Sequence, residues 1–199
     1  MRRLLGIAGL AVGLVLSSTA AEAGDRQIRV FLGSTFAGAT TFVDLENAAG
    51  QAHLTIGGQA CWLGEIFGVE GEVADTPGFF ERGSSNLVIN SRVTTFTGNV
   101  VVALPRSLTE YSLRLYFVGG GGIMRVREGD ALAVYDIATW VPAMDFGVGG
   151  LGFLTNRVGL SWELRRFQRV GAPPPLTGIS FAPEQLSYWR ANMALVIRY

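Results

Sequence analysis

The C-terminal segment alternates apolar and polar side chains with a period of two residues, and this pattern strongly limits the folds open to the chain. Arg190, Asn192 and Arg198 occupy one set of alternate positions. Successive side chains of a strand point to opposite faces, whereas a helix would scatter these polar groups around its surface. The segment is therefore predicted to be a strand with one apolar face. That face comprises Trp189, Ala191, Met193, Leu195, Ile197 and Tyr199.

Seven upstream segments repeat the alternation over roughly ten residues each, about the length that a tilted strand needs to cross a membrane. Short connections near 63–65, 105–110 and 154–156 alternate with long ones near 39–52, 76–91, 125–141 and 170–185. The pattern predicts an all-β fold, an eight-stranded antiparallel up-and-down transmembrane β-barrel with both termini at the short-turn end. The seven segments lie at 28–33, 54–62, 67–74, 95–104, 111–118, 144–149 and 158–165.

The first 23 residues have the three regions of a secretory signal peptide. Arg2 and Arg3 provide a positive start, residues 4–16 are apolar, and Ala21-Glu22-Ala23 matches the A-x-A cleavage pattern. The apolar run is too short for a transmembrane helix. We therefore expect residues 1–23 to be a cleaved signal peptide and residues 24–199 to form the barrel domain.

The composition excludes several classes of protein. The chain has 16 basic residues, all arginine, 16 acidic residues, one cysteine and 49% hydrophobic residues. A net charge of +0 argues against nucleic-acid binding, and a single cysteine argues against a disulfide scaffold. The polar faces are rich in small residues, which suit the crowded interior of an eight-stranded barrel. A soluble barrel with its two faces reversed stays open as an alternative.

Nine charged residues fall on the polar faces and are predicted to point into the barrel. An unpaired charge is costly in a lumen that holds little water, so we expect ion pairs. Strand order would bring Glu163 near Arg190 or Arg198. It would also bring the glutamates of the third segment near Arg29 or Arg114. We interpret the set as a structural network, with a narrow gated pore as the alternative. Its members are Arg29, Glu70, Glu72, Arg114, Asp145, Glu163, Arg165, Arg190 and Arg198.

Residue types that carry catalysis are scarce in this sequence. His53 is the single histidine, and nothing in its spacing from Ser84 or Ser85 indicates a catalytic arrangement. The four glycines at 119–122 lack the Lys-Ser/Thr of a phosphate-binding loop, so we expect them to bend a strand or adjoin the third loop. Cys61 is expected to point inward as a small side chain. We expect no catalytic, cofactor-binding or metal-binding site, and no enzyme.

Taken together, these features resemble the OmpA-like and opacity-like outer-membrane β-barrel domain family. Residues 146–167, with a glycine-rich strand, a short turn and a second strand, are similar to the penultimate hairpin of these domains. The ending at 193–199 resembles the terminal signal read by the barrel-assembly machinery, with Tyr199 where phenylalanine is usual. The resemblance covers nearly all of residues 24–199. It implies that the signal residues are Met193, Leu195, Ile197 and Tyr199.

The resemblance implies an outer-membrane location, reached by secretion through the inner membrane. The implied partners are outer-membrane lipid and, during biogenesis, the barrel-assembly machinery and periplasmic chaperones. We expect a structural membrane anchor whose long extracellular loops contact an extracellular ligand, with no cofactor and no nucleic-acid partner. The alternatives are a narrow pore or carrier for a small solute, and a lipid-modifying enzyme at the barrel rim.

Overall fold

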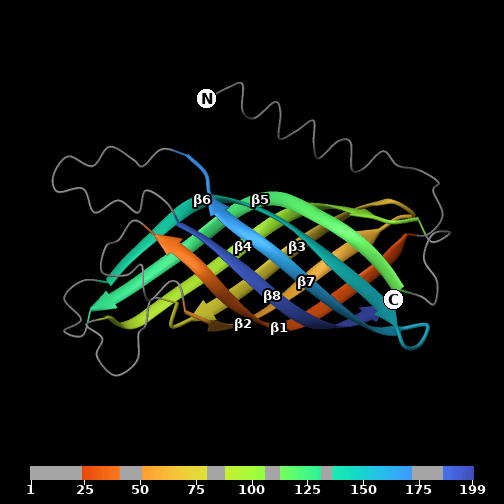
Figure 1. Cartoon of the computed structure of the whole chain (residues 1–199), viewed down its shortest axis with the longest axis horizontal. Coiled ribbons are helices and arrows are strands. Elements are labelled where there is room, and N and C mark those ends of the chain that lie inside the picture. The colour runs from red at the N-terminus through yellow and green to blue at the C-terminus, as the bar shows by residue number, and fades with distance from the viewer. Residues whose placement is uncertain (1–23, 41–50, 80–87, 106–112, 131–135, 172–185) are drawn as a thin grey trace.

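A computed structural model of the chain describes residues 24–40, 51–79, 88–105, 113–130, 136–171 and 186–199. Eight strands close into one antiparallel barrel, in which each strand pairs with its chain neighbours and β8 pairs with β1 (Figure 1). The predicted fold is thereby confirmed. The proposed signal peptide at 1–23 lies outside the described residues. The strands are β1 (Asp25–Thr40), β2 (His53–Leu63), β3 (Phe67–Pro77), β4 (Val88–Ala103), β5 (Leu113–Asp130), β6 (Asp136–Phe153), β7 (Val158–Arg169) and β8 (Leu186–Arg198).

The two ends of the barrel differ in their connections. The start of β1 and the C-terminus lie at the same end, on the right in Figure 1. We call this the turn end, because the connections at 64–66 and 154–157 are short. The opposite end, which we call the loop end, is where β1 leads to β2, β3 to β4, β5 to β6 and β7 to β8. None of the described residues forms a helix long and apolar enough to cross a membrane.

The long connection predicted at 125–141 is wrong. Residues 125–130 belong to β5 and residues 136–141 to β6, which leaves 131–135 between the two strands. β5 and β6 are each 18 residues long, well beyond the expected ten. The outward positions of β5 change from apolar to arginine at Arg125 and Arg127, while Met124 stays buried and inward. The hydrogen-bonded ladder of β5 therefore extends beyond the apolar alternation by which the strand was predicted.

The four consecutive glycines lie inside β5, not beside a loop. A Cβ atom added to Gly122 would lie 1.8 Å from the carbonyl oxygen of Phe96 on β4, and one on Gly120 would lie 2.3 Å from the carbonyl oxygen of Gly98. Neither contact leaves room for a side chain. These glycines therefore permit the close approach of β4 and β5.

Apolar side chains lie on both surfaces of the barrel, but in different arrangements. The outward positions are apolar and exposed over much of each strand, for example Val30 (60%), Phe117 (61%) and Met193 (65%). Inside, buried apolar residues form one cluster toward each end of the lumen. The turn-end cluster comprises Cys61, Leu63, Val101, Ala103, Tyr116, Val118, Leu151 and Val196. The loop-end cluster comprises Phe79, Val93, Met124, Val141, Ala143, Phe167, Leu186 and Tyr188.

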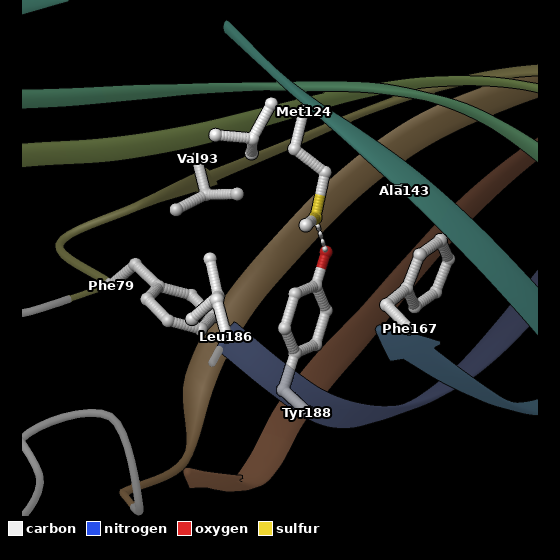
Figure 2. Packing of buried hydrophobic residues seen from close by; sticks show 8 residues of the cluster. Phe79, Val93, Met124, Ala143, Phe167, Leu186 and Tyr188 are labelled. Atoms are coloured by element: carbon white, nitrogen blue, oxygen red, sulfur yellow. Dashed lines mark hydrogen bonds between the residues drawn. The ribbon is translucent and has the colours of Figure 1, made fainter. Parts of the chain in front are cut away.

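Aromatic side chains dominate the loop-end cluster. Tyr188 projects into the lumen from β8, and its ring centroid lies 5.1 Å from that of Phe79 and 5.1 Å from that of Phe167. Figure 2 shows its hydroxyl pointing at the sulfur of Met124, to which it donates a hydrogen bond at 3.9 Å. The phenol of a buried tyrosine thus has a partner, and the rings fill this end of the lumen.

Candidate functional site: a charged and filled lumen

Arg165 of β7 is the centre of an ion-pair network between the two apolar clusters. Its Nη2 lies 2.7 Å from Oε1 of Glu70 and 2.8 Å from Oε2 of Glu163. Its Nη1 lies 3.3 Å from Oδ2 of Asp145 and 3.4 Å from Oε2 of Glu72. The side chains of all five residues are buried. One guanidinium therefore holds together carboxylates from β3, β6 and β7, with two of them coming from β3.

Arg29 of β1 closes the network on the turn-end side. Its Nη1 lies 3.1 Å from Oε1 of Glu163 and 3.5 Å from Oε2 of Glu70. The hydroxyl of Tyr116 accepts a hydrogen bond from Arg29 at 3.1 Å and donates one to Glu163 at 2.5 Å. This tyrosine thus joins the turn-end apolar cluster to the charges.

Arg190 of β8 closes the network on the loop-end side. Its Nη2 donates to both carboxylate oxygens of Glu72, at 2.6 and 2.7 Å. The guanidinium carbon lies 4.9 Å from the ring centre of Phe31 and 4.6 Å from that of Phe167. Aromatic faces attract a guanidinium, so these rings stabilise a charge that is out of contact with water.

Two of the predicted residues lie apart from the central network, at the turn end. Arg114 donates hydrogen bonds to the backbone carbonyls of Leu104 at 3.2 Å and Gly64 at 2.9 Å, and to that of Glu65. Arg198 lies 3.0 Å from the carboxylate of Asp25. These arginines tie together the strand ends and turns at this end of the barrel.

The pairings differ from those expected for neighbouring strands. Glu163 contacts Arg29 and Arg165, where Arg190 or Arg198 was expected. Of the expected partners for Glu70, the structure brings Arg29 within 3.5 Å. The bore of an eight-stranded barrel is narrow enough for long side chains to meet across it. Strands that share no edge, such as β1 and β7, are therefore neighbours in the lumen.

Several neutral members of the network were not predicted from the sequence. Gln59 donates to Glu72 at 2.9 Å and to Glu163 at 2.8 Å, and Asn99 donates to Glu70 at 3.2 Å. Each lies on the inward phase of its strand, a signal that was present in the sequence. These amides supply hydrogen bonds that the buried carboxylates require in addition to their ion pairs.

The remaining candidate residues form no reactive arrangement in the described chain. His53 stacks on Phe79 with ring centroids 5.8 Å apart, and Ser84 and Ser85 lie outside the described residues. Cys61 is a buried free thiol. Among the described residues, no group of histidine, cysteine and acidic side chains is arranged to hold a metal ion.

The residues of the proposed assembly signal lie on the outer face of β8 and at the C-terminus. Ile197 is 49% exposed and Tyr199 is 72% exposed. The backbone N–H of Tyr199 donates to the carbonyl oxygen of Arg26 at 3.1 Å, next to the pairing of β8 with β1. Met193 and Leu195 face outward on the same strand.

Solved structures share the architecture of this chain. Neisserial surface protein A is 8% identical, with a TM-score of 0.62 over 91% of this chain and 100% of that one. OprG from Pseudomonas aeruginosa is 13% identical, with a TM-score of 0.52 over 90% and 98% of the two chains. The N-terminal β-barrel domain of OprF, also from Pseudomonas aeruginosa, is 9% identical, with a TM-score of 0.51 over 88% and 99%.

The chain has the fold of the eight-stranded outer-membrane β-barrels. This agrees with the OmpA-like and opacity-like resemblance read from the sequence. No family model matches the chain, and no curated protein matches it in sequence. At such low identities the likeness is one of fold, so the role of this barrel has to be argued from its own side chains.

Proposed function

We propose that the protein is a membrane anchor of the outer membrane, a filled barrel that holds its loop-end connections at the cell surface. The observation that carries the proposal is the distribution of polarity across the barrel wall. Arg29, Arg165 and Glu72 are buried in the lumen, whereas the exposed outward positions of the strands are apolar, as at Val30, Phe117 and Leu195. A soluble barrel would have the reverse arrangement, because apolar surface is favourable outside only where lipid covers it.

The height of the outer apolar surface supports this location. On β5 the outward positions from Leu113 to Ile123 are apolar or glycine. Ten residue steps of about 3.3 Å, tilted by about 40°, span roughly 25 Å along the barrel axis. The apolar band of outer-membrane barrels is also about 25 Å tall. The barrel therefore suits a membrane of ordinary thickness.

The filled lumen favours an anchor over a pore. Side chains are buried at three successive levels, namely the turn-end cluster, the ion-pair network and the loop-end cluster. Water or a solute could pass only if the contacts of Arg165 with four carboxylates separated. Separating buried ion pairs costs several kcal/mol, about 3–5 kcal/mol when one partner is lost altogether.

The loop-end connections are the part of the chain left to meet other molecules. They run over 41–52, 78–87, 131–135 and 170–185, and most of their residues lie outside the described part of the chain. Surface loops held by a rigid scaffold commonly carry binding functions. We assign the interaction role to these connections and give His53 no catalytic part.

Two experiments test the proposal separately. For the barrel, the membrane fraction of expressing cells is extracted in detergent and run on gels with and without boiling. A mobility shift, in protein recovered only from outer membranes, is the expected result. Protein recovered from the periplasm without detergent would refute the membrane location. Planar-bilayer recordings should show no steady conductance, and open-channel currents would refute the filled lumen.

For the loops, a variant with residues 172–185 replaced by a short turn is compared with the full chain. The variant should keep the heat-dependent mobility shift, because the barrel is unchanged, and should lose adhesion or aggregation of the cells. A matched control inserts the same short turn at 106–112, a connection at the turn end. Equal adhesion and aggregation in the full chain and the 172–185 variant would refute a role for that loop.

A further inference from the structure

The outward surface carries arginines at the loop end of β4 and β5 that the filled lumen does not explain. Arg92 on β4 and Arg127 on β5 are direct partners in the strand ladder, and Arg125 precedes Arg127 on the same face by two residues. The Cβ atoms of such cross-strand partners are about 4.5–5.5 Å apart, and like charges placed opposite each other destabilise a sheet. We call these three residues the outer arginine cluster.

Few of the described groups neutralise this cluster. Arg92 Nε lies 3.4 Å from the carboxylate of Asp75, and both side chains are partly exposed. Within the part of the chain that the structure describes, Arg127 makes no hydrogen bond or ion pair. Arg125 lies over the ring of Trp140 at 5.3 Å, and its guanidinium forms no ion pair with the described residues. Two guanidinium groups therefore have donors to offer to an anion.

The cluster lies at the edge of the apolar band. On β5, Ile123 is the last apolar outward residue, and Arg125 is the next outward position toward the loop end. The apolar span of roughly 25 Å on β5 ends at this point. Trp140, the cross-strand partner of Arg125, is 51% exposed on the outer face. Tryptophan is enriched where hydrocarbon meets headgroups, which places the cluster at headgroup depth.

We propose that the outer arginine cluster binds a phosphate group of a lipid headgroup in the leaflet at the loop end. The planar fork of arginine matches the oxygens of a phosphate and binds it through paired, charge-assisted hydrogen bonds. The side chains project sideways from the barrel wall, directly above the apolar band. A phosphate attached to acyl chains would therefore meet the guanidinium groups while its chains cover Ile123 and Phe117. The inference rests on the proposed membrane location.

The test measures lipid retention by the folded full chain in detergent, using native mass spectrometry and three probes. The probes are lipid A with its phosphates, dephosphorylated lipid A, and inorganic phosphate as a competitor. The parent chain should retain phosphorylated lipid A. The variant R125Q/R127Q should bind it at least about tenfold more weakly, since it loses charge-assisted hydrogen bonds from two guanidinium groups. Arg26→Gln, an outward arginine at the turn end, serves as the matched control and should bind like the parent.

A second variant tests the same site by a gain of binding. Asp75→Asn removes the carboxylate that competes for Arg92, so retention of phosphorylated lipid A should increase. All variants are first checked for the heat-dependent mobility shift, which shows that the barrel is folded. This arm keeps the inference testable even where R125Q/R127Q fails to fold.

Several results would overturn the inference. Equal retention by the parent and R125Q/R127Q, or equal retention of dephosphorylated lipid A, would show that the cluster does not recognise the phosphate. Displacement of lipid A by excess inorganic phosphate would show a site for free phosphate instead of a lipid headgroup. If the chain enters vesicles but gives any of these results, only the proposed phosphate site is refuted, and the membrane barrel stands. A chain that stays in water without detergent refutes the proposed membrane barrel itself.

Discussion

Replacing Arg165 with methionine should destabilise the barrel more than replacing any arginine on its outer face. Methionine keeps much of the length of the side chain and removes the guanidinium, so the change isolates the charge. In the native lumen, Arg29, Arg165 and Arg190 face four carboxylates, from Glu70, Glu72, Asp145 and Glu163. The variant would leave two arginines for the same four buried acids.

The magnitude follows from the burial of these groups. Arg165 and Glu70 have fully buried side chains, so solvent does not screen the loss. Removing one partner of a buried ion pair costs about 3–5 kcal/mol. With an m-value of about 2 kcal/mol/M, the midpoint of urea unfolding should fall by about 1.5–2.5 M. Unfolding is followed by tryptophan fluorescence of the protein inserted in lipid vesicles.

Two comparisons decide whether the charge is responsible. Arg26→Met makes the same chemical change at an exposed outward position, and it should alter stability by no more than about 0.5 kcal/mol. The double variant R165M/E70Q removes one of the uncompensated acids and should recover part of the loss, because residues of one network are not additive. A loss below about 1 kcal/mol in R165M, or strictly additive effects in the double variant, would refute the network reasoning.

Other regions of the barrel yield three further predictions. Gly122→Ala should lower the free energy of unfolding by about 1–3 kcal/mol, because its Cβ would collide with the carbonyl oxygen of Phe96. Gly98→Ala has open space around its Cβ and should cost far less in the same urea titration. The thiol of Cys61 is buried, so a maleimide should label it slowly in the folded barrel and rapidly in urea; equal rates would contradict its inward position. Tyr116→Phe should lower the free energy of unfolding by about 1.5–3 kcal/mol, because its hydroxyl bonds two charged groups. An unchanged urea midpoint would show that those bonds contribute nothing.

The strands could be located in the sequence because each has an apolar outward phase. The same signal failed at the strand ends. The alternation of β5 continues past Ile123 with Arg125 and Arg127 facing outward, and a run of polar residues resembles a loop when only apolarity is read. The ends of β5 and β6 were set by the backbone ladder, which needs no apolar side chains.

The inward residues could also be identified from their phase, but their partners could not. The expected partners of Glu163 were on β8, because β8 shares an edge with β7. This expectation omitted Arg29, which reaches Glu163 across the lumen from β1. Distances across a narrow bore depend on the register of all the strands at once, and one segment of sequence contains no such information.

The pairing of β8 with β1 has a consequence for how the barrel forms. Arg29 pairs in the ladder with Val196, so the final hydrogen bonds join residues from opposite ends of the chain. Contacts between such distant residues are slow to form, because a long loop must close before they stabilise anything. Until β1 and β7 are both in place, Arg29 and Glu163 cannot form their ion pair. A partly formed sheet would then expose unpaired charges to the lipid. The charges inside this barrel therefore favour the closed barrel over open or misregistered sheets, in which Arg29 and Glu163 would be apart.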